Sequence, residues 1–108
     1  LMVRLNLNDQ SNIIDGTDLT ESNSLLNQNY PNPFAGSTTI SYELGSVSDV
    51  SIEIKDLTGR QVMVIDEGKK IAGKHFYQLQ ANKLEAGVYF YTLTAGGFSE
   101  TKQMVISK

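Results

Sequence analysis

The chain has few or none of several residue types that carry chemistry in proteins. Its 108 residues include no cysteine, no tryptophan, one histidine and two prolines. Without cysteine, disulfides and thiolate chemistry are excluded. No apolar run is long enough for a membrane-spanning helix. A catalytic triad or metal site that needs histidine would have to use His75 alone.

Charge is divided unevenly along the chain. Residues 1–29 carry one basic side chain against four acidic ones, whereas residues 30–108 carry eight of each. There is no basic stripe and no polybasic cluster, so we expect no binding to nucleic acid. Asn, Ser, Asp, Gln and Thr dominate residues 8–29, a composition that predicts an acidic linker. The alternation of Val3, Leu5 and Leu7 could be the last strand of a preceding domain.

Both prolines lie in one segment, Tyr30-Pro31-Asn32-Pro33-Phe34. Each proline fixes φ and removes a backbone donor, and the residue before it is pushed toward an extended conformation. The segment should therefore be stiff, non-helical and unable to pair as a central strand. We expect it to separate a linker over residues 1–29 from a domain over residues 30–108.

Beyond residue 37 the chain alternates between apolar and polar side chains, interrupted by turn signals. The predicted strands span residues 38–44, 50–55, 61–65, 75–79, 88–93 and 98–106. A turn over 56–60 with Gly59, a charged loop over 68–73 and a turn before Gly87 separate some of them. Residues 88–93 are bulky on both faces and should form a central strand. This pattern predicts an all-β fold, an antiparallel Ig-like β-sandwich of about six to seven short strands.

The titratable residues favour structural roles. His75 alternates with Tyr77 and Leu79 along a predicted strand, and the pair Asp66-Glu67 belongs to a predicted solvated loop. No Gly-rich phosphate loop opens a helix, and the acidic linker does not have EF-hand spacing. Loose calcium binding by Asp15 and Asp18 is disfavoured. We therefore predict no enzyme, no cofactor and no metal site.

Aromatic residues leave a second interpretation open. Most of the tyrosines fall at alternating strand positions, where core packing is expected, whereas Phe76 and Phe98 are the predicted exposed aromatics. Exposed rings could bind sugars, although the absence of tryptophan weakens that case. The alternative function is therefore an accessory β-sandwich, carbohydrate-binding or spacer, attached to an extracellular enzyme.

Six segments, in this order, resemble the pattern of a known family. They are residues 30–34, 39–44, 50–62, 73–75, 84–93 and 101–106. Together they resemble the type A C-terminal sorting domain of the type IX (Por) secretion system of Bacteroidetes, over about residues 27–108. The residues of this pattern that we select as recognition candidates are Tyr30, Pro31, Asn32, Pro33, Phe34, Gly59, Gly87, Tyr89, Lys102 and Val105.

The resemblance implies a sorting signal for a larger cargo protein, since such domains sit at the C-terminus of secreted or surface proteins. It implies two partners besides the upstream cargo domain, an outer-membrane translocon and a sortase-like peptidase that usually cleaves in the linker. The domain would pass through the periplasm, reach the cell surface or medium, and be monomeric. We also expect the last strand, with Lys102 protruding, to offer a free edge for strand addition.

Overall fold

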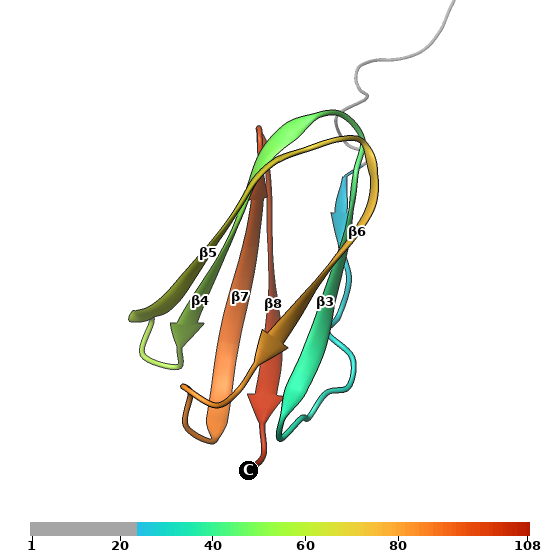
Figure 1. Ribbon diagram of the computed structural model, residues 1–108. Helices are drawn as coiled ribbons and strands as arrows, with labels where there is room; N and C mark the ends of the chain where they lie inside the picture. Colours follow the sequence, from blue (N-terminus) through green and yellow to red (C-terminus); the bar gives the residue numbers. More distant parts are fainter. Residues whose placement is uncertain (1–23) are drawn as a thin grey trace, which may run out of the picture.

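The computed structural model describes residues 24–108, in which seven antiparallel strands form two sheets (Figure 1). The strands are β2 (Leu25–Leu26), β3 (Ser37–Leu44), β4 (Ser48–Asp56), β5 (Gln61–Lys70), β6 (Gly73–Gln80), β7 (Gly87–Ala95) and β8 (Phe98–Ile106). Strands β2, β3 and β6 make the small sheet, and β5, β4, β7 and β8 make the large sheet, each in that order. The predicted all-β sandwich and the central position of β7 are confirmed.

The core lies between the two sheets and follows from the alternation in the sequence. One face of each of the central strands is buried, as with Ile40 and Tyr42 on β3, Ile52 on β4, and Tyr91 and Leu93 on β7. Phe98 is half-buried and packs against this core, so the prediction that it is exposed is wrong. Phe76 is exposed, as predicted.

The predicted loop over residues 68–73 is wrong, because β5 continues to Lys70 and β6 begins at Gly73. The strand continues through a β-bulge, in which Val50 pairs with Gly68 while Ser51 pairs with Asp66, leaving Glu67 as the extra residue. Charged side chains over this stretch signalled a loop, yet they occupy the exposed edge of the large sheet.

Several predictions concern residues outside the described range, namely the strand at Val3–Leu7, the linker over 8–23 and the acidic pair Asp15 and Asp18. Residues 24–29, assigned to the linker from their composition, pack on the sandwich, where Leu26 is buried. Within residues 24–108 no helix is long and apolar enough to cross a membrane. No group of three histidine, aspartate or glutamate side chains in this range is arranged to hold a metal ion.

Candidate functional site

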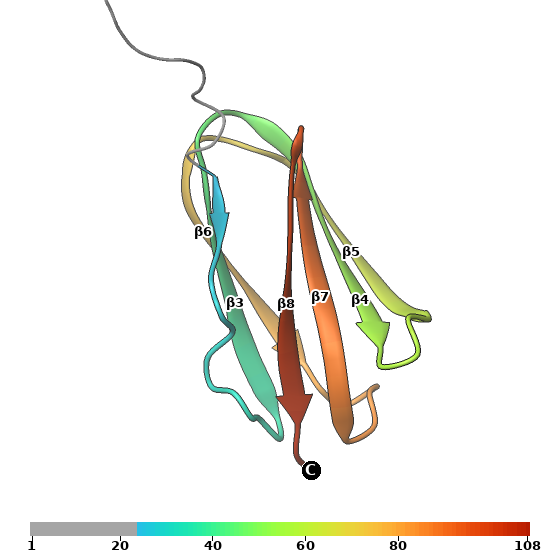
Figure 2. The same ribbon diagram turned by 180° about the vertical axis from the view of Figure 1, so that it is seen from behind.

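Residues 25–34, which we call the strap, run beside β3 along the side of the sandwich (Figure 2) and pair with both β3 and β8. The first part belongs to the small sheet, since Leu26 pairs with Tyr42 and the Tyr30 and Thr39 backbones exchange hydrogen bonds of 3.0 and 2.9 Å. The last part belongs to the large sheet, since Phe34 forms a parallel bridge with Ile106. The strap thus changes sheet within Tyr30–Phe34, where prolines cost no ladder hydrogen bond.

A buried polar cluster holds the middle of the strap. Asn29 is 2% exposed, and its backbone N–H donates to the Tyr91 hydroxyl at 2.8 Å. That hydroxyl donates in turn to the Asn27 carbonyl at 2.8 Å. The Asn29 side-chain amide donates to Thr38 Oγ1 and to the Pro31 carbonyl. Burial raises the pKa of Tyr91 to about 12, although the Asn29 N–H acts in the opposite direction.

The end of the strap is fastened to the C-terminal end of β8. Phe34, 2% exposed, donates its N–H to the Val105 carbonyl at 3.1 Å and accepts from the Ser107 N–H at 2.8 Å. The Asn32 side-chain oxygen accepts from the Val105 N–H at 2.9 Å. Two candidates from the proline segment therefore satisfy the backbone of a third, Val105, which lies 71 or more positions away in sequence.

The turn between β4 and β5 is built around Asp56. Its carboxylate accepts from the Thr58 N–H and hydroxyl, and from the Arg60 N–H and Nε. The Thr58 hydroxyl, with the other donors, lowers the pKa of Asp56 to about 2 despite some desolvation. Gly59 has φ of 90°, a left-handed conformation that glycine adopts without strain. The turn therefore presents the Arg60 side chain, 78% exposed, from a fixed backbone.

The loop from β6 to β7 is fixed by Tyr89 and Gly87. Tyr89 is buried, and its hydroxyl donates to the Glu85 carbonyl at 2.8 Å. Gly87 begins β7 with φ of 153°, at the limit of the region that favours glycine. Leu84 is buried beneath the loop and donates its N–H to the Ala81 carbonyl. Backbone and core contacts thus fix this loop.

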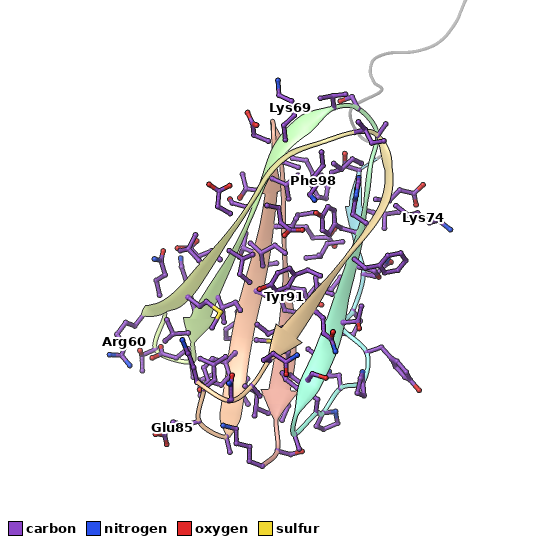
Figure 3. All side chains as sticks on the ribbon, viewed as in Figure 1. Arg60, Lys69, Lys74, Glu85, Tyr91 and Phe98 are labelled. Carbon is purple, nitrogen blue, oxygen red and sulfur yellow. The ribbon has the colours of Figure 1, made fainter. Side chains whose placement is uncertain are left out.

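The turn and the loop line an open cleft of about 360 Å³. Figure 3 shows Arg60 and Glu85 at the same end of the sandwich, the end where the C-terminus lies in Figure 1. The lining residues are Arg60, Gln61, Val62, Lys83, Leu84, Glu85 and Tyr89. All but Lys83 belong to the segments 50–62 and 84–93 that carry the family resemblance. We call this end of the sandwich, with the cleft and the junction of strap and β8, the motif end.

The structure brings together most of the predicted site residues and separates one. Phe34, Gly59, Gly87, Tyr89 and Val105 lie at the motif end, with Asn32 bound to Val105. Pro31 and Pro33 are exposed beside them, and Tyr30 is 81% exposed next to β3.

Lys102 lies opposite Tyr91 in the register, away from the motif end. Its ammonium is 3.3 Å from Glu100, whose other carboxylate oxygen accepts from the Leu26 N–H of the strap. The Lys102 side chain is 31% exposed, so the expectation that it protrudes is wrong. The free edge predicted for β8 is also partly covered, because the strap bonds to Val105 and Gln103.

Sequence reasoning missed the polar residues that fasten the strap, Asn27, Asn29 and Thr38. Asn27 and Asn29 lie in a polar, Asn-rich stretch and look like linker residues, whereas Thr38 falls in a predicted strand that gives no sign of its polar contacts. It also missed Glu67, which accepts a 2.9 Å hydrogen bond from the buried Tyr42 hydroxyl across the sandwich. Burial, with the bond to Glu67 and its charge, raises the pKa of Tyr42 well above its usual value.

These features define a class of protein, a small Ig-like sandwich whose N-terminal strap is fastened to its last strand and whose fixed turns surround a cleft. Residues 28–107 match the family model of the secretion system C-terminal sorting domain, and the chain belongs to this family. Members are the C-terminal sorting signals of type IX secretion cargo, so the chain directs a cargo protein to export and to secretion or the cell surface. No curated protein matches the chain.

Proposed function

We propose that the secretion machinery recognises this sorting signal at the motif end. The observation that supports the proposal is the cleft, because two segments of the family pattern that are distant in sequence line it together. Its polar groups, from Arg60, Gln61, Lys83 and Glu85, stand on a turn and a loop that backbone hydrogen bonds hold in place. A surface fixed in this way binds without the cost of ordering its loops.

The strap would set the start of the folded module. We propose that the domain extends from about residue 24 and that the linker before it links the cargo to the sorting signal. Buried residues at Leu26 and Asn29 support this division. Peptidases prefer exposed segments without fixed structure. The cleavage that usually follows export in this family would therefore fall before residue 24, made by a sortase-like peptidase.

The sorting domain itself would catalyse nothing. Its single histidine supports this, because one ring nitrogen of His75 is bonded to the Ile71 carbonyl at 2.7 Å and the ring stacks on Tyr42. We further propose the type A class, a Bacteroidetes source, passage through the periplasm as a monomer, and binding to the outer-membrane translocon. The basis for these is the resemblance of the motifs.

The experiment fuses residues 22–108 to a periplasm-targeted fluorescent protein in a Bacteroidetes host with an intact type IX system. We expect the reporter to leave the periplasm. Retention in the periplasm, while the host exports its own cargo, would show that the sorting function is wrong.

Two charge reversals test the recognition surface. Arg60→Glu changes the cleft, whereas Lys69→Glu makes the same change at the opposite end of the sandwich (Figure 3). Both side chains are exposed, and the backbone N–H groups of Thr58 and Arg60 still donate to Asp56 when the Arg60 Nε bond is lost. Both fusions should therefore fold, as circular dichroism would check. Arg60→Glu should reduce the exported fraction several-fold and Lys69→Glu should not. Equal export of the two variants would move recognition away from the motif end.

A further inference from the structure

Within residues 24–108 the sandwich has four sheet edges, on β2, β6, β5 and β8, and three of them are protected. Unpaired edges attract other strands, and proteins protect them with short strands, bulges, lysines, inward-pointing charges or covering segments. Strand β2 has only two residues. Strand β8 is partly covered by the strap, which bonds to Gln103 and Val105. Its charged residues Glu100 and Lys102 lie on the inward-facing side of the strand, where they alternate with exposed residues.

Strand β5 is protected by irregularity and charge. Its pairing with β4 shifts register twice, which places bulges at Val62 and Glu67. Lys69 and Lys70 follow at its end. A regular partner strand could not pair along the whole of such an edge.

In the part of the chain that the structure describes, strand β6 has none of these devices apart from a single lysine, Lys74. It pairs with β3 over eight successive residues without a register shift. Odd-numbered residues of β3 direct their backbone groups to the strap, as Thr39 does to Tyr30 and Ser41 to Asn27. Even-numbered residues of β3 therefore bond to β6, through its residues 73, 75, 77 and 79. The N–H and C=O groups of Lys74, Phe76, Gln78 and Gln80 consequently point to the free edge.

A hydrophobic side chain and a hollow accompany these free groups. Phe76 is 69% exposed on the outer face of the small sheet. Beside it a hollow of about 250 Å³ is lined by Asn27, Ser41, Tyr42, Glu43, Lys74 and Phe76. Lys74 points away from the sandwich on this side (Figure 3). A strand added at β6 would place alternate side chains on this face, next to Phe76.

We infer that the β6 edge is a strand-addition site for an extended segment of a partner protein, with an apolar side chain packed on Phe76. A second copy of the chain fits less well. Two rigid sandwiches joined along one eight-residue edge make a narrow contact, whereas stable interfaces bury on the order of 1,600 Å². A free segment can pair with the edge and also fold its side chains over the outer face. The site does not depend on the proposed recognition surface, because β6 lies outside the motif end.

The test uses the full chain, labelled for NMR, and an octapeptide probe that copies β3, Ser-Thr-Thr-Ile-Ser-Tyr-Glu-Leu, the natural neighbour of β6. At millimolar peptide the amides of Lys74, Phe76, Gln78 and Gln80 should become protected from hydrogen exchange. The amides of residues 75, 77 and 79 already bond to β3 and should not change. The same peptide with two central prolines should protect nothing.

Two variants support the assignment. Gln78→Pro removes a free-edge N–H while keeping the β3 ladder, and should weaken binding about tenfold relative to Gln78→Ala. Phe76→Ser leaves the backbone unchanged and should weaken binding of the peptide up to about fivefold. It replaces Gln78→Pro as the test if that variant does not fold. The inference is overturned if no amide of β6 is protected, or if protection appears on β5 or β8 instead. Concentration-dependent dimerisation that protects β6 without peptide would also overturn it, since the occupant would then be a second copy.

Discussion

The hydroxyl of Tyr91 is the most informative single group to remove, because it joins the strap to the large sheet. Tyr91→Phe keeps the buried ring and deletes two hydrogen bonds, one from the Asn29 N–H and one to the Asn27 carbonyl. Asn27 is exposed, so its carbonyl can turn to water, whereas Asn29 is 2% exposed and its N–H would be left without an acceptor. An unsatisfied buried donor costs about 1–3 kcal/mol.

We therefore expect Tyr91→Phe to lower the free energy of unfolding by about 2 kcal/mol, or the melting temperature by about 8–16 °C for a domain of this size. Urea denaturation followed by circular dichroism would measure it, with an unchanged m-value. Tyr77→Phe is the matched control, because within residues 24–108 the Tyr77 hydroxyl makes no hydrogen bond to another group. It should change stability by less than about 0.5 kcal/mol. Equal effects of the two variants would refute the strap as a polar anchor.

The pH dependence gives a second measure of the same hydroxyl. Its pKa is raised to about 12 in the folded state, whereas an unfolded tyrosine titrates near 10. The folded state thus holds this proton more tightly, so the contribution of the Tyr91 hydroxyl to the free energy of unfolding is complete below pH 10. That contribution is lost as the pH rises toward 12. A difference of two between the folded and unfolded pKa values corresponds to roughly 2–3 kcal/mol of stability. The free energy of unfolding should therefore fall less between pH 10 and pH 12 in Tyr91→Phe than in the original chain. An equal fall in both would contradict the reasoning.

Three further predictions concern the motif end. The pKa of Asp56 is lowered to about 2, so its contribution to stability is complete above about pH 4 and is lost as the pH falls toward 2. In Asp56→Asn the free energy of unfolding should therefore depend less on pH in this window. An unchanged dependence would contradict the turn contacts. Gly87→Ala should destabilise by about 1–2 kcal/mol because of its φ, whereas Gly97→Ala, which meets nothing within 4 Å and has no left-handed φ, should be nearly neutral in the same urea experiment. Phe34→Ala should lower the free energy of unfolding by about 3 kcal/mol, because it empties a buried position and loosens the strap. Phe76→Ala, at an exposed position, should lower it by less than about 0.5 kcal/mol. Calorimetry would measure both, and equal losses would contradict the packing of the strap.

The parts of the fold that the sequence predicts are those fixed by neighbouring residues. Alternation on β4, as in Ile52 and Ile54, marks a half-buried strand without knowledge of its partners. Gly59 marks a turn because its conformation is a local requirement. The prediction failed over residues 68–70, where a bulge lets charged residues continue an edge strand, since a bulge depends on the opposite strand.

The strap could not be predicted because its contacts are distant in sequence and mainly polar. Asn29 meets Tyr91 from 62 positions away, and Leu26 meets Glu100 from 74 positions away. A two-residue strand such as Leu25–Leu26 has no period to detect. The candidate residues came from the family resemblance, which gave their order along the chain. That Tyr89 lines a cleft beside the turn of Gly59, and that Phe34 meets Val105, are properties of the fold alone.

The junction of strap and β8 also decides which experiments can test recognition. Deleting residues 102–108 would remove Met104 and Ile106 from the core, together with the Val105 and Ser107 groups that hold the strap. Lost export after such a deletion would report unfolding as readily as lost recognition. The proline segment has the same difficulty, because Phe34 is buried. The two ends of the family match therefore stabilise the sandwich jointly. Recognition has to be sought at exposed side chains such as Arg60, whose Nε supplies only one of the four hydrogen bonds that the Asp56 carboxylate accepts.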